Sequence, residues 1–291
     1  MYISKKFFND TPLHKNIASK TILQSLEKNF QRFIRTSCAL KSDYRNKMVN
    51  VFTDFFNTVG EEVNSPFNGY SVKHDTRWTL FTTNYDRCLE AFWRENLRIV
   101  LDTGFRDKSG SFSSDGTLHA DQFLFSFGSE LQCLRDGRPG RLRLVKLHGS
   151  TTWLIRQDTG EIEEKPFDID QGINLGTGSM YTDEVVIYPL RQKQLYVDPY
   201  IQMFFLLNKE LRYNKVWIVI GYSFRDPVIQ NIFSNNFKDG KKMILIHPHP
   251  EEVKQRFPDH EDDIIVIEKY FGRNGDQEVI NSTIKEEPKK L

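Results

Sequence analysis

The chain has 291 residues, with 40 Lys and Arg against 39 Asp and Glu, and therefore a formal net charge of +1 at pH 7. This balance excludes a whole-chain field that would attract nucleic acid or an anionic membrane, so we expect no direct nucleic-acid binding. The longest apolar runs fall far short of the ~20 residues that span a bilayer, and no signal-peptide pattern follows Met1. We therefore expect a cytoplasmic protein with no membrane partner.

Cysteine usage limits the kinds of metal site the chain can build. Cys38, Cys88 and Cys133 are odd in number, far apart and without a CxxC pair. This pattern fits a reducing compartment and excludes a zinc site made of four cysteines.

The first 65 residues are predicted to be helical. Apolar residues from Thr21 to Arg35 and from Met48 to Val59 recur at the spacing of one helical face, and Gly60 stands where a C-cap glycine belongs. Such stripes more often face a core than a partner protein, so core packing is the favoured interpretation.

From Trp78 to about residue 268 the pattern changes to strands alternating with helices. Trp78 to Thr82 and Lys215 to Ile220 are apolar strand runs, each followed by a polar loop and a helical pattern. The further strand candidates are Arg141 to Leu147, Val185 to Tyr188, Lys242 to Ile246 and Asp263 to Ile267, with a helix from Pro199 to Leu211. This alternation predicts an α/β fold with a mostly parallel sheet covered by helices on both faces.

Several segments are predicted to lie outside that sheet. Gly104 to Gly116 and Asp158 to Gly178 are interpreted as lids or surface loops, and a small hairpin is expected around Trp153 to Ile162 with its turn at residues 158–160. We predict one domain over residues 1–272, with a flexible tail over 273–291.

Three segments fall at the carboxyl ends of predicted strands, where ligands of such sheets bind. They are Thr82 to Asp86, Lys146 to Ser150 and Ile220 to Asp226. We predict that they form one nucleotide site.

In the first segment, Asp86 fits the N-cap of a helix that begins at Arg87. Asn84 has no such structural role, and an amide at a strand end can hold a ribose hydroxyl or a water. From the local pattern alone, the structural and functional interpretations are evenly balanced.

In the second segment, His148 stands between the end of a strand and Gly149. A lone histidine is more often structural, but a side chain that titrates near neutral pH suits a general base. Gly149 would let a ligand approach the backbone closely.

In the third segment, Asp226-Pro227 fits the N-cap and first position of a helix. The N–H groups of the turn could bind a phosphate, with Gly221 and Ser223 as binding candidates. Two further side chains, His247 and His249, could bind a metal weakly, but a turn after a strand is favoured and no metal is expected.

Taken in order, FTTNYD, KLHGS, VIYP and VIGYSFRDPVI resemble the SIR2-like family, in particular its branch in prokaryotic anti-phage defence proteins, over about Trp78 to Ile246. The resemblance implies a Rossmann-like NAD site in which Asn84 and His148 are catalytic. It implies that Asp86 contacts the carboxamide and that Ser223 and Gly221 face the ribose or phosphate. Thr83, Tyr85, Gly149 and Asp226 are expected as further NAD contacts.

Defence-type relatives that lack the sirtuin zinc module resemble NAD hydrolases, which release nicotinamide and ADP-ribose and deplete NAD during infection. The resemblance also implies a homo-oligomer, or a complex with an ATPase, a nuclease or an Argonaute-like partner.

One family feature has no counterpart between Met1 and Trp78, namely the GAGxS loop that carries the pyrophosphate. Three alternatives follow: an upstream segment, a different mode of dinucleotide binding, or no dinucleotide binding. The rival hypothesis is therefore a non-catalytic subunit that binds ADP-ribose or serves as a scaffold. The presence of both Asn84 and His148 favours the enzyme.

Overall fold

The fold is taken from a computed structural model that describes residues 29, 38, 42–63, 77–95, 100–104, 118–119, 141–156, 162–164, 181–186, 199–238, 240–273 and 275–286. Apart from residue 29, the helix expected over residues 21–35 lies outside the described residues. The same holds for the turn expected at 158–160 and for all of the 104–116 segment except Gly104.

Two three-stranded parallel sheets form the middle of the molecule. The first has the order β1-β4-β2 and the second the order β10-β9-β8, and every pairing in both is parallel. Their strands are β1 (Arg77–Thr82), β2 (Val100–Asp102), β4 (Arg141–Lys146), β8 (Val216–Ile220), β9 (Lys242–Ile246) and β10 (Ile264–Ile267). All of these except β2 were predicted from the sequence.

Both faces of these sheets are buried, and the apolar side chains alternate between them. In β8, Trp217 and Val219 join one hydrophobic core while Ile218 and Ile220 pack on the other. β1 and β9 alternate between the same two cores. The two sheets therefore act as one layer, since a strand points successive side chains to opposite faces.

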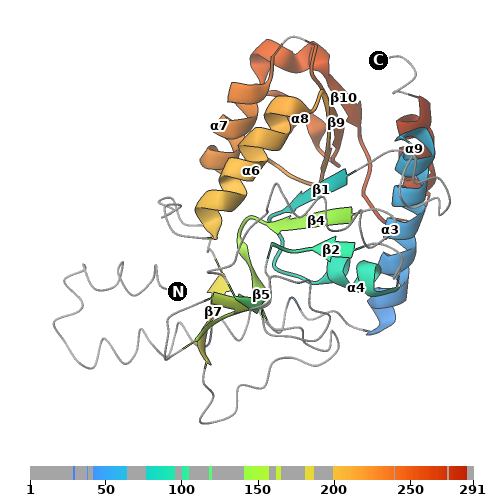
Figure 1. The fold of residues 1–291 in the computed structure, drawn as a ribbon. Helices are drawn as coiled ribbons and strands as arrows, with labels where there is room; N and C mark the ends of the chain where they lie inside the picture. The colour runs from blue at the N-terminus through green and yellow to red at the C-terminus, as the bar shows by residue number, and fades with distance from the viewer. Residues whose placement is uncertain are drawn as a thin grey trace.

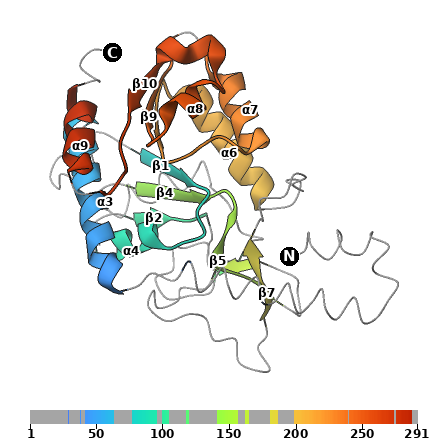
Figure 2. The same ribbon diagram turned by 180° about the vertical axis from the view of Figure 1, so that it is seen from behind.

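Helices cover this layer on both faces (Figures 1 and 2). One core is completed by α6 (Tyr200–Tyr213), α7 (Pro227–Asn236) and α8 (Pro250–Lys254), and the other by α3 (Ser42–Val63), α4 (Cys88–Glu95) and α9 (Asp276–Glu286). A 3-10 helix, η4 (Pro258–Asp263), leads into β10. The predicted α/β fold, with a mostly parallel layer between helices, is confirmed. Of the helical start predicted over the first 65 residues, α3 confirms residues 42–63.

A four-stranded antiparallel sheet, β3-β6-β5-β7, extends from the end of β4. β5 (Gly149–Arg156) begins after a two-residue turn and pairs with β6 (Ile162–Glu164) and β7 (Tyr181–Val186), while β3 (Leu118–His119) pairs with β6. The hairpin predicted around residues 153–162 is confirmed. The strand expected at 185–188 is placed too late, because β7 already begins at Tyr181.

The prediction that Gly60 caps a helix is wrong. α3 continues through Gly60 to Val63. A glycine within a helix costs about 1 kcal/mol. In α3 this cost is offset by packing, since Phe55 and Phe56 are buried and the Phe56 ring stacks on Phe92 with a centroid distance of 5.2 Å.

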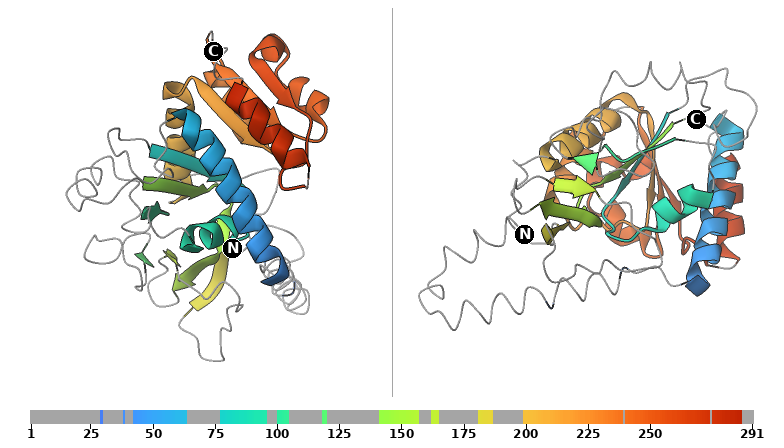
Figure 3. Two further views of the ribbon diagram at one scale, coloured as in Figure 1. Left: turned by 90° about the vertical axis from the view of Figure 1, so that its right-hand side faces the viewer. Right: turned by 60° about the horizontal axis from the view of Figure 1, so that its bottom comes forward.

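The flexible tail expected from residue 273 is also corrected for residues 276–286. They form α9, which packs beside α3 and buries Ile280 and Ile284 (Figure 3). The pattern of these two residues spans only one helical turn, which is too short to stand out in the sequence. Among the described helices, none combines the length and apolar character that crossing a membrane requires.

Candidate functional site

The carboxyl ends of β1 and β4 lie side by side. Thr82 pairs with Lys146 at the last position of the two strands, and the Leu147 N–H donates to the Thr82 carbonyl at 2.9 Å. Since the strands are parallel, the first two predicted segments leave the sheet at the same edge.

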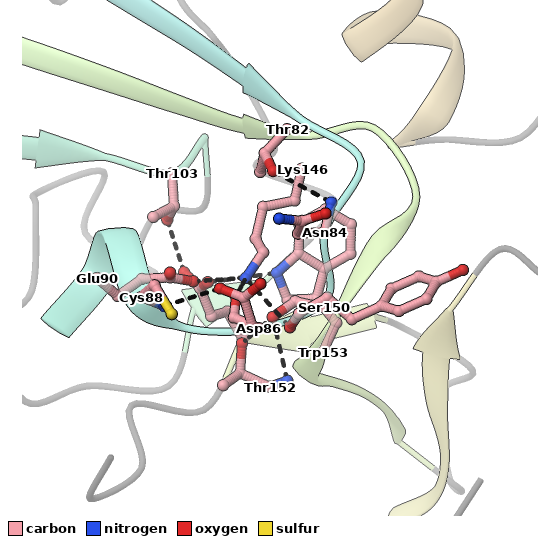
Figure 4. Close-up of polar contacts among 12 residues, drawn as sticks. Thr82, Asn84, Asp86, Cys88, Glu90, Thr103, Lys146, Ser150, Thr152 and Trp153 are labelled. Carbon is pink, nitrogen blue, oxygen red and sulfur yellow. Dashed lines mark hydrogen bonds and ion pairs between the residues drawn. The ribbon is translucent and has the colours of Figure 1, made fainter. Parts of the chain in front are cut away.

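The loop after β1 is shaped by short-range hydrogen bonds. The Thr82 Oγ1 accepts the Asn84 N–H at 3.1 Å, and the Asp86 Oδ1 accepts the Cys88 N–H at 3.0 Å (Figure 4). Asp86 thus accepts an N–H of the first turn of α4, but the helix starts at Cys88, so the N-cap position predicted for Asp86 falls on Arg87. Asn84 is exposed, so its amide is accessible from solvent.

His148 joins the second segment to the third. Its Nε2 lies 3.3 Å from the Asp226 Oδ2, and the two side chains are only 11% and 8% exposed. The Tyr85 ring lies beside the imidazole, with a centroid distance of 6.4 Å. His148 therefore lies next to a residue of each of the other two segments.

Asp226 uses its two oxygens differently. Oδ1 accepts the Val228 N–H at 3.0 Å and caps α7, with Pro227 at the first helical position. Oδ2 faces His148. The predicted cap is confirmed, and the pairing with His148 is a role that the sequence did not indicate.

The Gly221 N–H is used within the fold, because it donates to the Ile246 carbonyl at 2.8 Å. Gly221 adopts a φ of +64°, a conformation that glycine accommodates without strain, which explains the residue at this turn. Ser223, in the same loop, is half-buried.

Phe224 anchors the third segment. Its side chain is 0% exposed, and the rings of Tyr222, Phe233 and Phe257 surround it at centroid distances of 4.9 Å. It also adopts a left-handed φ of 54°, which is uncommon for a residue other than glycine. A strained backbone persists only where its surroundings fix it, and this aromatic cluster does so.

Lys146 begins the second predicted segment, but the sequence analysis gave this side chain no role of its own. It ends β4 with only 3% of its side chain exposed, and its Nζ lies 2.7 Å from the Glu90 Oε1. The ammonium also donates to the Asp86 carbonyl and, at 3.4 Å, to the Tyr85 carbonyl. One signal was available, since Lys146 follows Leu144 by two residues and therefore shares its buried face.

The comparisons with known proteins place the chain in a family. A family model described as a SIR2-like domain matches residues 79–270, which is more than half of the chain. The chain belongs to the SIR2-like family. Membership indicates an NAD-related function and places the chain in a family that includes NAD-dependent enzymes.

A solved structure described as "Structural Basis for the Mechanism and Regulation of Sir2 Enzymes" is similar at 19% sequence identity, with a TM-score of 0.32. The match covers 55% of this chain and 59% of that one, so the SIR2-like chain spans less than two thirds of its length. A search of curated proteins found no match.

This SIR2-like chain also buries the carboxyl group of Glu164. Glu164 accepts hydrogen bonds from the Thr103 hydroxyl at 2.6 Å and the Trp153 indole at 3.2 Å. Burial raises the pKa of Glu164 to about 7, although both hydrogen bonds oppose the shift. Burial, followed by the charge of Asp86, raises the pKa of the Cys88 thiol to about 12, so Cys88 is a neutral thiol and a poor nucleophile.

The turn after β9 explains the two histidines that the sequence offered as weak metal ligands, His247 and His249. The His247 Nδ1 accepts the His249 N–H at 3.0 Å, which supports the predicted turn. Within the described residues, no three His, Cys, Asp or Glu side chains gather as a metal site requires.

Proposed function

We propose that the chain hydrolyses NAD to nicotinamide and ADP-ribose at this edge of the sheet. The observation that carries the proposal is the meeting of the three segments around His148, which lies 3.3 Å from Asp226 and next to the exposed Asn84 loop. Its support is this geometry in a chain of the SIR2-like family.

The reaction breaks the bond between the ribose anomeric carbon and the nicotinamide nitrogen, and the electron pair of that bond leaves with neutral nicotinamide. Positive charge develops on the ribose, and water then adds to the same carbon and gives up a proton. Asn84 would orient the ribose and the water through its amide. His148 would accept the proton from the water or from a ribose hydroxyl.

Asp226 would support that proton transfer. When the His148 Nε2 donates to the Asp226 carboxylate, Nδ1 is the nitrogen that accepts the proton. The Asp226 carboxylate would also hold the imidazole ring in one orientation, since the two side chains lie 3.3 Å apart and are largely buried.

The test is nicotinamide release from NAD by purified protein, with and without candidate partner proteins. We expect Asn84→Ala and His148→Ala to lower the rate by about 100-fold or more. Asp226→Asn should lower kcat by about 10-fold without lowering the melting temperature, because asparagine caps a helix as well as aspartate does.

Two matched controls are available. Asn235→Ala and His249→Ala remove the same side chains from exposed positions outside the three segments, and both should leave the rate unchanged. Equal nicotinamide release from the wild type, Asn84→Ala and His148→Ala would contradict the proposal. ADP-ribose binding without any release would support the non-catalytic alternative instead.

We further propose that this activity serves anti-phage defence, as the family resemblance suggests, either in a homo-oligomer or with a defence partner. In infected cells that produce the wild-type chain, NAD should fall, whereas cells that produce Asn84→Ala should retain it. Retention of NAD in both would remove the defence role while leaving the enzymatic proposal standing.

A further inference from the structure

Lys146 places a cation in the protein interior at the strand end that leads to His148. Its side chain is 3% exposed, and it precedes His148 by two residues. A buried ammonium is costly unless it is both paired and hydrogen-bonded. The positions of its partners therefore indicate what the residue does.

All three hydrogen-bond partners of Lys146 lie on the Asn84 loop or on α4, the helix that follows it. They are the Glu90 carboxylate at 2.7 Å, the Asp86 carbonyl, and the Tyr85 carbonyl at 3.4 Å (Figure 4). An ammonium has three N–H donors, so these acceptors match its full capacity. The Lys146 ammonium therefore contacts both the Asn84 loop and α4.

We propose that Lys146 is a positioning residue that fixes the Asn84 loop relative to His148. The ammonium holds the two carbonyls that directly follow Asn84 in the chain, and Glu90 neutralises it from the first turn of α4. Because Lys146 and His148 share one strand end and turn, the contact sets the distance between amide and imidazole. The kinetic part of this inference rests on the proposed NAD hydrolysis.

The test uses Lys146→Met, which keeps the length of the side chain and removes its charge. On its own it leaves Glu90 as a buried, unpaired carboxylate, so this variant should lose stability. Lys146→Met combined with Glu90→Gln removes both charges and should restore a melting temperature close to that of the wild type. In this double variant we expect kcat for NAD to fall by about 10- to 100-fold, with KM changing less than kcat.

A second readout does not depend on activity. Hydrogen exchange of the amides at residues 83–86 should be faster in the double variant than in the wild type, while exchange in β9 stays the same. The matched control is Lys242→Met with Asp263→Asn, which removes another ion pair of 2.7 Å at the opposite end of the parallel layer. This control should change neither kcat nor exchange at 83–86.

The outcomes separate the two proposals. If the wild type releases no nicotinamide, NAD hydrolysis fails, while faster exchange at residues 83–86 still supports the contact made by Lys146. Wild-type exchange in the folded double variant would overturn the inference whatever the activity. Faster exchange with wild-type kcat would overturn it as well, because the loop would then be free to move without affecting the reaction.

Discussion

Glu164 shows how burial sets the charge of a single side chain near the site. The group accepts two hydrogen bonds, and these favour its ionised form, yet burial dominates and raises its pKa to about 7. The nearby charge of Glu90 acts in the same direction as burial, and that of Lys146 opposes it. Glu164 is therefore partly protonated near neutral pH.

This carboxyl group should make stability depend on pH. Between its ordinary pKa of 4.5 and its folded value of about 7, the folded chain binds more protons than the unfolded chain, so stability falls as pH rises through this window. Glu164→Gln should remove this fall and be more stable than the wild type at pH 8, by up to roughly 3 kcal/mol. At pH 4.5 and below, the stability difference that arises from the charge of Glu164 should disappear.

Denaturant unfolding of both proteins between pH 5 and 8 measures the effect. Glutamine can still accept from one partner and donate to the Thr103 hydroxyl, so the polar contacts are largely kept. Glu268→Gln changes an exposed carboxyl and serves as the control. If the free energies of unfolding of the wild type and Glu164→Gln changed with pH in parallel, this would contradict the raised pKa of Glu164.

The positions of the candidate site residues at strand ends were predictable from the sequence. Asn84, His148 and Asp226 follow strand runs, and parallel strands bring their carboxyl ends to one edge. The contact between His148 and Asp226 was not predictable, because it joins residues 78 positions apart and depends on how the two sheets meet. The burial of Lys146 and its pairing with Glu90 were not predicted, because a lysine at a strand end is usually solvated.

At the scale of elements, the loop Gly221 to Asp226 is held from within the core. Phe224 enters the cluster that α7 and Phe257 complete, and Asp226 caps α7 only two residues later. The loop that orients Asp226 toward His148 therefore depends on an apolar anchor as well as on its polar cap.

Phe224→Ala should lower the free energy of unfolding by about 3–5 kcal/mol, the usual cost of deleting a buried phenylalanine side chain. Phe205→Ala is the matched control, since Phe205 is 60% exposed on α6, and it should stay within about 0.5 kcal/mol of the wild type. Equal losses from the two variants, measured by urea unfolding, would show that Phe224 does not anchor the loop.

The elements predicted correctly are those whose apolar residues show a clear strand or helix pattern in the sequence. β1, β4, β8, β9 and β10 are apolar runs of strand length, and α6 and α7 carry clear helical faces. The elements misjudged depend on tertiary contacts. β5 follows β4 without a turn signal other than glycine, and α3 passes through Gly60 because its aromatic face is buried.

At the scale of the whole molecule, α3 and α9 close the second core together. They come from opposite ends of the described chain and pack against each other over the same face of the layer (Figure 3). We therefore propose that the parallel layer and these two helices unfold as one domain.

Ile280→Ala tests this arrangement, because Ile280 is 0% exposed on α9. We expect a loss of about 2–5 kcal/mol in the free energy of unfolding. The neighbouring Val279→Ala, at a position 43% exposed, should be nearly neutral. Probes on α3 and on β9 should report one common transition in both variants, and separate transitions would show that α9 belongs to an independent unit.

The turn of Leu147 and His148 limits where the chain can accept insertions. Only these two residues separate β4 from β5. An insertion there would carry His148 away from Lys146 and Asp226, whereas an insertion between β5 and β6 would leave those distances as they are. We therefore expect insertions to be tolerated in evolution between β5 and β6, and to be selected against at the turn between β4 and β5.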